Sequence, residues 1–339
     1  MTKAFVSGCA GLSLTADEIA FFREENPWGL ILFARNIEEP DQVRELTESF
    51  RTAVGRLDAP VLVDQEGGRV QRLKPPNWRK YPAPKLYGDL FETDAEKALR
   101  AAWLGARLIA ADLFDVGINI DCLPCLDVRF PDTVDAIGDR AFSSDPEVVA
   151  QLGSAMIDGA IAGGVLPVIK HIPGHGRARV DSHLELPKVE AEYSSLKNVD
   201  FRPFHALSHV SLGMTAHIVY TGIDADSAGT QSARIVQDVI RGEIGFDGCL
   251  MSDDISMHAL GGDFGDRSRR IIDAGCDIVL HCNGDMDEMR AVAAVVPELR
   301  GEGLRRCETA LQGLKVPDPE FQTADAWAQL QDLAGWRGV

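Results

Sequence analysis

Residues 165–176 read VLPVIKHIPGHG, and this stretch decides how the rest of the chain is interpreted. Its first five residues, Val165–Ile169, form a short apolar run that predicts a buried strand. Pro173 and Gly174 then break the chain into a loop. One lysine and two histidines lie at this transition, where a rigid scaffold aims reactive side chains. The stretch therefore predicts a strand whose carboxyl end serves chemistry, in preference to a turn whose histidines only cap the backbone.

Similar short apolar runs recur along the chain, separated by longer segments of helical pattern. The predicted strands are 4–8, 29–33, 61–64, 117–121, 165–170, 212–217, 248–252 and 277–281. The predicted helices are 41–54, 94–115, 145–163, 199–210, 231–243 and 285–313. Strands that alternate with helices indicate a parallel sheet, and eight of them predict a closed (β/α)₈ TIM-type barrel. The main alternative is a doubly wound open sheet, which lacks its G-x-G-x-x-G fingerprint here.

The 339 residues fit a single catalytic barrel domain spanning 1–339. Segment 74–86 is predicted to be a loop within that domain. The tail 316–339 is weakly patterned, and Trp327 and Trp336 predict that it packs back onto the barrel.

The amino-acid composition limits the kinds of binding partner and the cellular compartment that we expect for the protein. The formal net charge of −18, without a long basic cluster, argues against a nucleic-acid partner. No secretory signal or membrane-spanning run is evident. The seven cysteines are an odd number, and several lie in apolar runs, which favours reduced thiols and a cytoplasmic location. Cys122 and Cys125 form a C-x-x-C spacing without a second pair, so we interpret them as packing residues.

Polar side chains follow several predicted strands at the point where each ends. Asp64, the Lys170–His171 pair, His217 and the Asp253–Asp254 pair all occupy such positions. Active sites of (β/α)₈ barrels lie at the carboxyl ends of the strands. We therefore expect these groups to converge on one site.

The residue types in this set indicate two kinds of chemistry. Asp253 offers a nucleophile, a general base or a metal ligand, whereas Asp254 can cap the next turn. Asp181, two residues before His183, can fix the proton on that histidine. A carboxylate nucleophile with a positioned proton donor is the minimal set for glycoside cleavage. A loop metal site built from His171, His175, Asp181, His183 and Asp253 stays open as the alternative, although Pro173 and Gly174 exclude a helical zinc pair.

The stretch 64–72, DQEGGRVQR, supplies candidate binding groups. Asp64 and Arg72 suit the hydroxyl and carbonyl groups of a sugar, and Lys170 and His171 form a second clamp. Arg140, in the loop 136–142, can be brought inward. We interpret Glu66, Arg69 and Gln71 as structural.

The chain resembles the bacterial β-N-acetylglucosaminidases of glycoside hydrolase family 3, of the single-domain NagZ type. The resemblance runs through nearly the whole chain. It is carried by Gly29–Asn36, Asp64–Arg72, Ile137–Phe142, Lys170–Gly176, Asp181–His183, Met214–His217, Gly245–Gly248 and Ser252–Met257. The segment Arg177–Val180 is a departure in a part of the loop that varies in the family, and we expect its two arginines to affect the leaving-group side.

The resemblance implies a (β/α)₈ barrel that acts as an exo-acting retaining β-N-acetylhexosaminidase, with no metal and no cofactor. Asp253 resembles the nucleophile, His183 the general acid/base and Asp181 its partner. The residues that match sugar-binding positions are Asp64, Arg72, Arg140, Lys170 and His171. The implied substrate is a muropeptide derived from peptidoglycan, N-acetylglucosaminyl-anhydro-N-acetylmuramic acid, in cytoplasmic cell-wall recycling.

Three alternatives stay open at this point: a metal-dependent hydrolase on a TIM barrel, a β-glucosidase-like relative, and a sugar-binding barrel without catalysis. The sequence predicts a small-molecule sugar partner, with no nucleic acid and no membrane. It leaves the oligomeric state, and the choice between water and phosphate as acceptor, undetermined.

Overall fold

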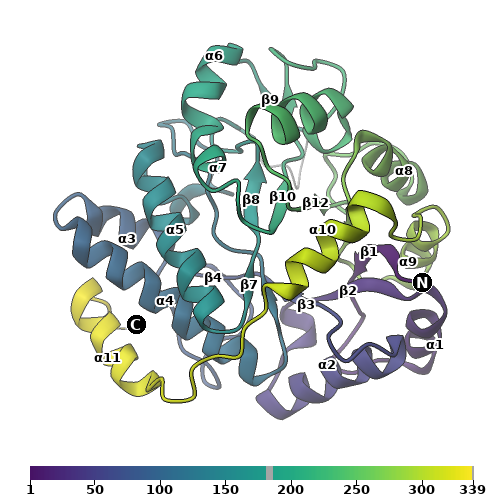
Figure 1. Ribbon diagram of the computed structural model, residues 1–339, viewed down its shortest axis with the longest axis horizontal. Helices are drawn as coiled ribbons and strands as arrows, with labels where there is room; N and C mark the ends of the chain where they lie inside the picture. Colours follow the sequence, from purple (N-terminus) through teal and green to yellow (C-terminus); the bar gives the residue numbers. More distant parts are fainter. Residues whose placement is uncertain (181–185, 338–339) are drawn as a thin grey trace.

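The computed structural model describes residues 1–180 and 186–337. Within them, each of the eight predicted strands is present in one parallel sheet (Figure 1). The strands are β1 (Lys3–Ser7), β2 (Pro27–Leu32), β3 (Val61–Val63), β6 (Ile120–Asp121), β7 (Leu166–Pro167), β8 (Ile169–Ile172), β10 (Leu212–Thr215), β12 (Cys249–Asp254) and β13 (Ile278–His281). The predicted strand 165–170 corresponds to β7 and β8 together.

The order of the strands closes the sheet into a barrel. Neighbours run β7-β6-β3-β2-β1-β13-β12-β10-β8, and every pairing between them is parallel. The two ends of this order are β7 and β8, which only Val168 separates in the chain. One continuous segment therefore pairs with β6 on one side and β10 on the other. This confirms the predicted (β/α)₈ barrel.

Helices surround the barrel in the order expected for alternating strands and helices (Figure 1). The α-helices are α1 (Ala16–Glu25), α2 (Pro40–Val54), α3 (Pro84–Phe91), α4 (Ala95–Asp115), α5 (Pro146–Ala162), α6 (Tyr193–Ser195), α7 (Arg202–Ala206), α8 (Phe264–Ala274), α9 (Met286–Ala293), α10 (Gly301–Gln312) and α11 (Thr323–Ala334). Shorter or wider helical turns are η1 (Ala34–Asn36), η2 (Gly138–Arg140), η3 (Leu196–Asp200), η4 (Gly229–Gln231) and η5 (Ile235–Glu243). Two small sheets lie outside the barrel, the β4 (Gln65–Gly67) and β5 (Val70–Gln71) hairpin and the β9 (Lys188–Val189) and β11 (Val219–Tyr220) pair.

Several helix predictions were wrong in their limits. The predicted helix 231–243 is present as the π-helix η5, which begins at Ile235, whereas the predicted helix 199–210 is divided between η3 and α7. The helices α1 and α8 were missed. The predicted loop 74–86 already ends at Pro84, where α3 begins.

The predicted helix 285–313 is in fact two helices. The break between them pairs with the start of β1, because Ala4 N–H donates to Pro297 O and Leu299 N–H donates to Thr2 O. Gly301, the first residue of α10, then takes a left-handed conformation, φ 54°. Tertiary pairing therefore interrupts a segment whose apolar pattern is continuous.

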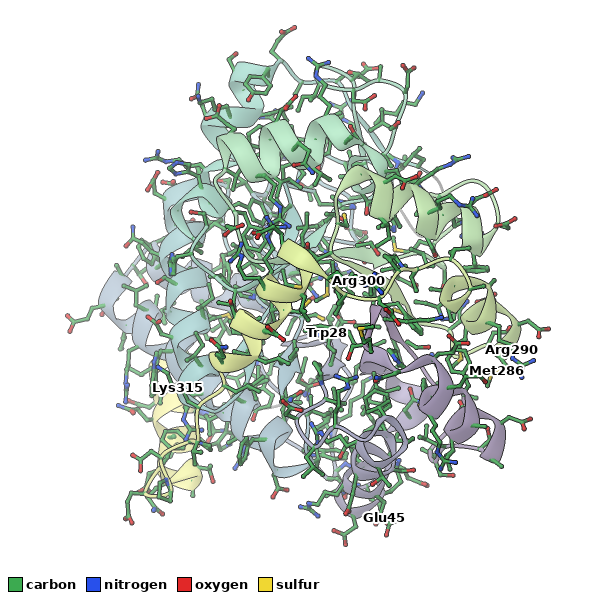
Figure 2. The ribbon with its side chains drawn as sticks, turned by 45° about the vertical axis from the view of Figure 1, so that its right-hand side comes forward. Trp28, Glu45, Met286, Arg290, Arg300 and Lys315 are labelled. Atoms are coloured by element: carbon green, nitrogen blue, oxygen red, sulfur yellow. The ribbon has the colours of Figure 1, made fainter. Side chains whose placement is uncertain are left out.

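Helix α10 closes the amino-terminal end of the barrel. Cys307 and Ala310 of α10 belong to the same buried cluster as Trp28, Leu166 and Cys249, which lie at the starts of strands. Figure 2 shows Trp28 beside this helix near the centre of the view, whereas Glu45 and Arg290 lie at the periphery. The barrel is thus closed below by packed side chains, which leaves its opposite end for a site.

The tail contacts the body through aromatic groups. Trp327 of α11 meets the ring of Tyr81 edge-on, with centroids 5.6 Å apart, and Trp336 donates to Lys80 O. Among the described residues, no helix combines the length and apolar character needed to cross a bilayer.

Candidate active site

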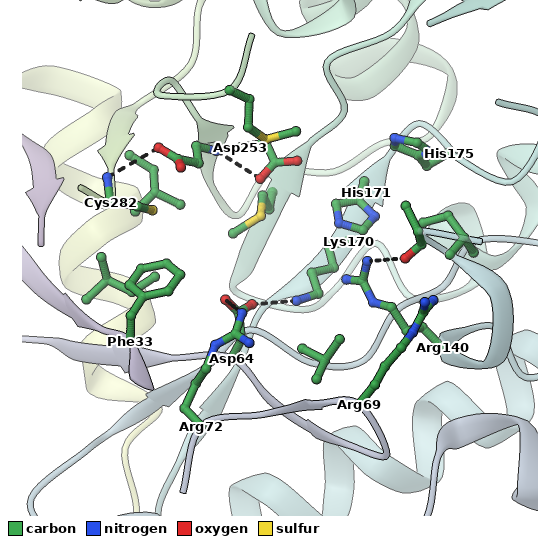
Figure 3. A pocket seen from close by; sticks show the side chains of 18 residues that line it. Phe33, Asp64, Arg69, Arg72, Arg140, Lys170, His171, His175, Asp253 and Cys282 are labelled. Carbon is green, nitrogen blue, oxygen red and sulfur yellow. Dashed lines mark hydrogen bonds and ion pairs between the residues drawn. The ribbon is translucent and has the colours of Figure 1, made fainter. Parts of the chain in front are cut away.

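A cavity of about 310 Å³ opens at the carboxyl ends of the barrel strands (Figure 3). It is lined by residues in or just after the last part of β2, β3, β8, β10, β12 and β13, together with the β4–β5 hairpin and the loop around η2. The lining residues are Ile31, Phe33, Asp64, Arg69, Val70, Arg72, Ala136, Ile137, Arg140, Lys170, His171, His175, Met214, Asp253, Asp254, Met257, Leu280 and Cys282. Six of the eight predicted site residues therefore meet in this cavity.

The remaining two, Asp181 and His183, lie outside the described residues. Their assignment stays a prediction. The described chain approaches that segment from His175, which lines the cavity.

A network of ion pairs forms one wall of the cavity. Lys170 Nζ lies 2.8 Å from Asp64 Oδ1 and 2.6 Å from Glu66 Oε1. Arg140 binds Glu66 with two nitrogens, Nε at 2.9 Å and Nη2 at 2.7 Å. Arg72 Nη2 completes the set at 3.3 Å from Asp64 Oδ2. Two acids and three bases are thus interleaved, so each charge has an opposite neighbour.

Burial and the neighbouring charges shift the pKa values of these groups in opposite directions, and the effect of the charges is the larger. Burial by itself raises the pKa of Asp64, but Lys170 and Arg72 outweigh it and hold the pKa well below the usual range. Burial likewise raises the pKa of Glu66, yet Arg140 and Lys170 lower it to about 2. Burial lowers the pKa of Lys170, and Asp64 and Glu66 raise it well above its ordinary value. All of these groups are therefore charged at neutral pH.

The two neighbouring carboxylates at the end of β12 have different surroundings. Asp254 Oδ1 accepts from Ser256 N at 2.9 Å and from Cys282 N at 3.2 Å, so it braces the turn and the end of β13. Asp253 Oδ1 accepts one backbone N–H, that of Asp254, at 2.8 Å. Burial raises the pKa of Asp253, but the nearby His171 and His217 lower it below its ordinary value. Asp253 is therefore an ionised carboxylate in the cavity.

Asp127 holds the two histidines that line the cavity, His171 and His175. Its Oδ2 lies 2.7 Å from His171 Nδ1, and its Oδ1 accepts from His175 N at 2.6 Å. Burial and His171 lower the pKa of the His175 ring to about 4, so that ring is neutral at physiological pH. Asp127 was not among the residues predicted from the sequence. In the sequence it lies six residues after the predicted strand 117–121, and in the structure an isolated bridge between Cys125 and Lys170 carries the chain back toward the barrel just before it.

The structure agrees with only some of the interpretations made for the residues around Asp64. Gln71 is structural as expected, since its Nε2 donates to Leu73 O and Arg79 O. Glu66 does not line the cavity but neutralises two of its cations. Arg69, interpreted as structural, lines the cavity and pairs with Asp139 at 3.0 Å. Phe33, whose ring centroid lies 5.2 and 5.3 Å from the guanidinium carbons of Arg35 and Arg72, was not predicted as a lining residue.

One set of described residues has the donor types of a metal site: Cys125, Asp127 and His171. All three are buried, and their ligand atoms lie within 4.8 Å of one another. They are already hydrogen-bonded together, since Asp127 Oδ2 also accepts from Cys125 Sγ at 3.2 Å. A cation there must displace the protons that these contacts share.

Comparison with known proteins places this geometry in a family. The sequence model of the glycosyl hydrolase family 3 N-terminal domain matches residues 15–310. The chain belongs to glycoside hydrolase family 3. It is a hydrolase of the β-hexosaminidase group within that family.

Relatives support the assignment along most of the chain. A β-hexosaminidase of Pseudomonas aeruginosa is 39% identical over 299 residues, 87% of each chain. One from Alkalilimnicola ehrlichii is 37% identical over 345 residues, covering 97% of this chain and 92% of the relative. NagZ from Neisseria gonorrhoeae, solved in complex with N-trifluoroacetyl-D-glucosamine, superposes with a TM-score of 0.88 at 30% identity and 98% coverage of both chains. The same NagZ, solved in complex with zinc ion, gives a TM-score of 0.86 at 29% identity over 98% of both chains.

Proposed function

We propose that this hydrolase is an exo-acting retaining β-N-acetylglucosaminidase that acts through a covalent glycosyl-enzyme. The observation that carries the proposal is Asp253, an ionised carboxylate at the end of β12 that faces a wall of fixed charges across a small cavity. A carboxylate so placed suits attack on an anomeric carbon, because positioned polar groups hold the sugar hydroxyls.

The shape of the site supports removal of a terminal sugar. Packed apolar side chains such as Val6, Leu62 and Met251 fill the barrel beneath the cavity. A sugar chain therefore cannot run through the barrel, and only its end can enter. Asp64, Arg72, Arg140, Lys170 and His171 are assigned to this terminal residue.

The proposed reaction has two steps. In the first, an oxygen of Asp253 bonds to C1, the glycosidic C1–O bond breaks, and His183 gives a proton to the departing oxygen. In the second, water attacks C1 as His183 takes its proton, and the bond to Asp253 breaks. Two inversions give net retention of the β-configuration. Asp181 keeps the proton of His183 in place for both steps.

The proposed natural substrate is a muropeptide, N-acetylglucosaminyl-anhydro-N-acetylmuramic acid with or without peptide, in cytoplasmic cell-wall recycling. Support comes from the family resemblance and from the amino-sugar ligand in the gonococcal NagZ structure. A site built to pair polar groups rejects an analogue that leaves them unpaired. We therefore expect selection for the 2-acetamido group.

The test compares 4-nitrophenyl N-acetyl-β-D-glucosaminide with 4-nitrophenyl β-D-glucoside, followed by proton NMR of the first-formed sugar. The N-acetylglucosaminide should be cleaved at least about 100-fold better in kcat/KM, since site polar groups are left unpaired otherwise, and the first product should be the β-anomer. Asp266→Asn is a surface change on α8 that removes only the pair with Arg269. It serves as the control and should give the same substrate preference and the same first product as the wild type. An α-anomer would refute the covalent step, and preference for the glucoside would refute the substrate assignment.

A further inference from the structure

Asp127 is a fully buried carboxylate that collects donors from three residues, Cys125, His171 and His175. Its Oδ2 meets His171 Nδ1 at 2.7 Å and Cys125 Sγ at 3.2 Å, and its Oδ1 accepts His175 N at 2.6 Å. The backbone N–H of His171 points to the same Oδ1 at 3.4 Å. Burial raises the pKa of Asp127, but His171 and His175 lower it well below the usual range. The carboxylate is therefore ionised and can only accept.

An acceptor at this position fixes the proton of the His171 ring. Because Asp127 Oδ2 has no hydrogen to give, His171 Nδ1 must carry one. In the neutral ring the other nitrogen, Nε2, is then bare. His171 lines the cavity next to Lys170 (Figure 3), so Nε2 is the ring nitrogen that it can offer to a ligand. A bare Nε2 accepts a hydrogen bond from a sugar hydroxyl.

The same carboxylate holds the backbone of the turn that follows. Gly174 N–H donates to His171 O at 2.7 Å, which closes the turn, and Asp127 Oδ1 binds the next N–H along, that of His175. His175 and His171 are thereby kept with their ring centroids 5.4 Å apart. The turn cannot tilt without breaking the contact to Asp127.

Cys125 gains a role from this arrangement. The C-x-x-C spacing was interpreted as packing, and Cys122 does lie in the buried cluster inside the barrel. Cys125 instead donates its thiol hydrogen to Asp127 Oδ2 from two residues earlier in the same segment. Burial raises the pKa of the Cys125 thiol well above its ordinary value, so the hydrogen is retained.

We propose that Asp127 is a positioning residue of the glycosidase site, which sets the proton of His171 so that Nε2 accepts from a hydroxyl of the terminal sugar, with Cys125 as its supporting donor. The assignment of His171 to the sugar rests on the proposed function. The position of the proton does not, and it can be measured without substrate.

The first measurement uses the unmodified protein labelled with ¹⁵N-histidine. Two-bond ¹H–¹⁵N spectra at neutral pH, with the His171 signals identified from His171→Gln, should show hydrogen on Nδ1 and none on Nε2. Hydrogen on Nε2, whether in a neutral ring or in a ring protonated on both nitrogens, would overturn the proposal outright, because Nε2 then cannot accept.

The second measurement uses Asp127→Asn. The short contact to His175 N requires an oxygen, so the amide NH₂ of the new side chain is turned toward His171 Nδ1. That nitrogen must then accept, and the ring hydrogen moves to Nε2, which reverses its polarity toward the sugar. We expect the NMR pattern to reverse and kcat/KM for the N-acetylglucosaminide to fall about 10- to 100-fold, the usual effect of losing an orienting partner.

Deoxy substrates separate positioning from general damage. The 3-, 4- and 6-deoxy N-acetylglucosaminides each lack one hydroxyl. For the analogue that lacks the hydroxyl bound by Nε2, Asp127→Asn should cost little beyond the loss already caused by the missing group. An equal loss with every analogue would refute an effect through His171.

Asp277→Asn is the matched control. Asp277 is also a buried carboxylate that accepts a strand N–H, that of Leu250 at 2.9 Å, and it pairs with Arg241 at 2.8 Å. It lies at the start of β13, at the closed end of the barrel. This variant should lose stability yet keep the His171 proton pattern and the wild-type response to deoxy substrates. If both variants lose activity alike and the His171 proton stays on Nδ1 in Asp127→Asn, Asp127 is merely structural. If Asp127→Asn does not fold, the spectrum of the unmodified protein still decides the proton.

Discussion

Replacing Glu66 by glutamine removes one charge from the centre of the ion-pair network while keeping its shape. Glu66 is 1% exposed and serves Arg140 and Lys170 together. Its pKa falls from an ordinary 4.5 to about 2. A shift of this size corresponds to about 3 kcal/mol of stability at neutral pH. Removing one partner of a buried ion pair generally costs about 3–5 kcal/mol, which agrees.

The pH dependence of this loss has a definite sign. The pKa of Glu66 is depressed in the folded protein, so its contribution is complete above about pH 5 and disappears as the pH falls toward 2. The difference in unfolding free energy between wild type and Glu66→Gln should therefore be about 3 kcal/mol at pH 7 and about 1 kcal/mol at pH 3. Groups outside the network that titrate in this range affect both proteins alike.

Urea and thermal unfolding followed by circular dichroism test this prediction. With an unfolding entropy of about 2.1 cal/mol/K per residue over 339 residues, a loss of about 3 kcal/mol lowers Tm by about 4 °C. Asp89→Asn is the control, because the exposed Lys85–Asp89 pair at 2.5 Å should contribute less than about 0.5 kcal/mol. A loss below about 1 kcal/mol at pH 7, or a difference that is the same at pH 3 and pH 7, would show that charge does not hold this wall together.

The remaining predictions concern the reaction. Asp253→Ala should reduce kcat by at least about 10³-fold with little change in Tm, because the covalent step is lost; near-normal turnover in this variant, with loss in Asp254→Ala, would mean that the wrong carboxylate was chosen. His183→Ala should impair substrates with poor leaving groups far more than nitrophenyl glycosides, which depart without a proton, and Asp181→Asn should show the same trend more weakly; equal losses on both substrate types would remove His183 from the role of acid. Chelator treatment should leave the rate on the N-acetylglucosaminide unchanged, and a chelator-sensitive rate restored by added metal would favour the metal-dependent alternative.

The barrel was predictable because its signal is local. Each strand is visible in the sequence as an apolar run such as 61–64 or 277–281. The first polar residue after the run marks the end of the strand. Since parallel strands share one carboxyl edge, the residue pattern was enough to bring Asp64, Lys170 and Asp253 together. Their convergence on one cavity follows from the alternation of strands and helices alone.

The ion pairs and hydrogen bonds between residues distant in the chain were not predictable in this way. The sequence shows that Glu66 is an acid, but its pairing with Arg140, 74 residues further on, depends on where two loops meet. Asp127 reads as one more acid after a strand, and only the fold shows that three donors converge on it. The division of 285–313 into two helices likewise depends on backbone groups at the start of β1.

The sequence by itself therefore determined the order of strands and helices, the closed barrel, the family and the edge at which the site lies, because periodicity and turn residues act within a few positions of one another. Only the tertiary structure decided which charges neutralise which, which nitrogen of His171 carries its proton, and what closes the far end of the barrel. These depend on contacts between residues distant in the chain, and burial there changes the energy of a charge or a hydrogen bond far more than the identity of its neighbours in sequence does.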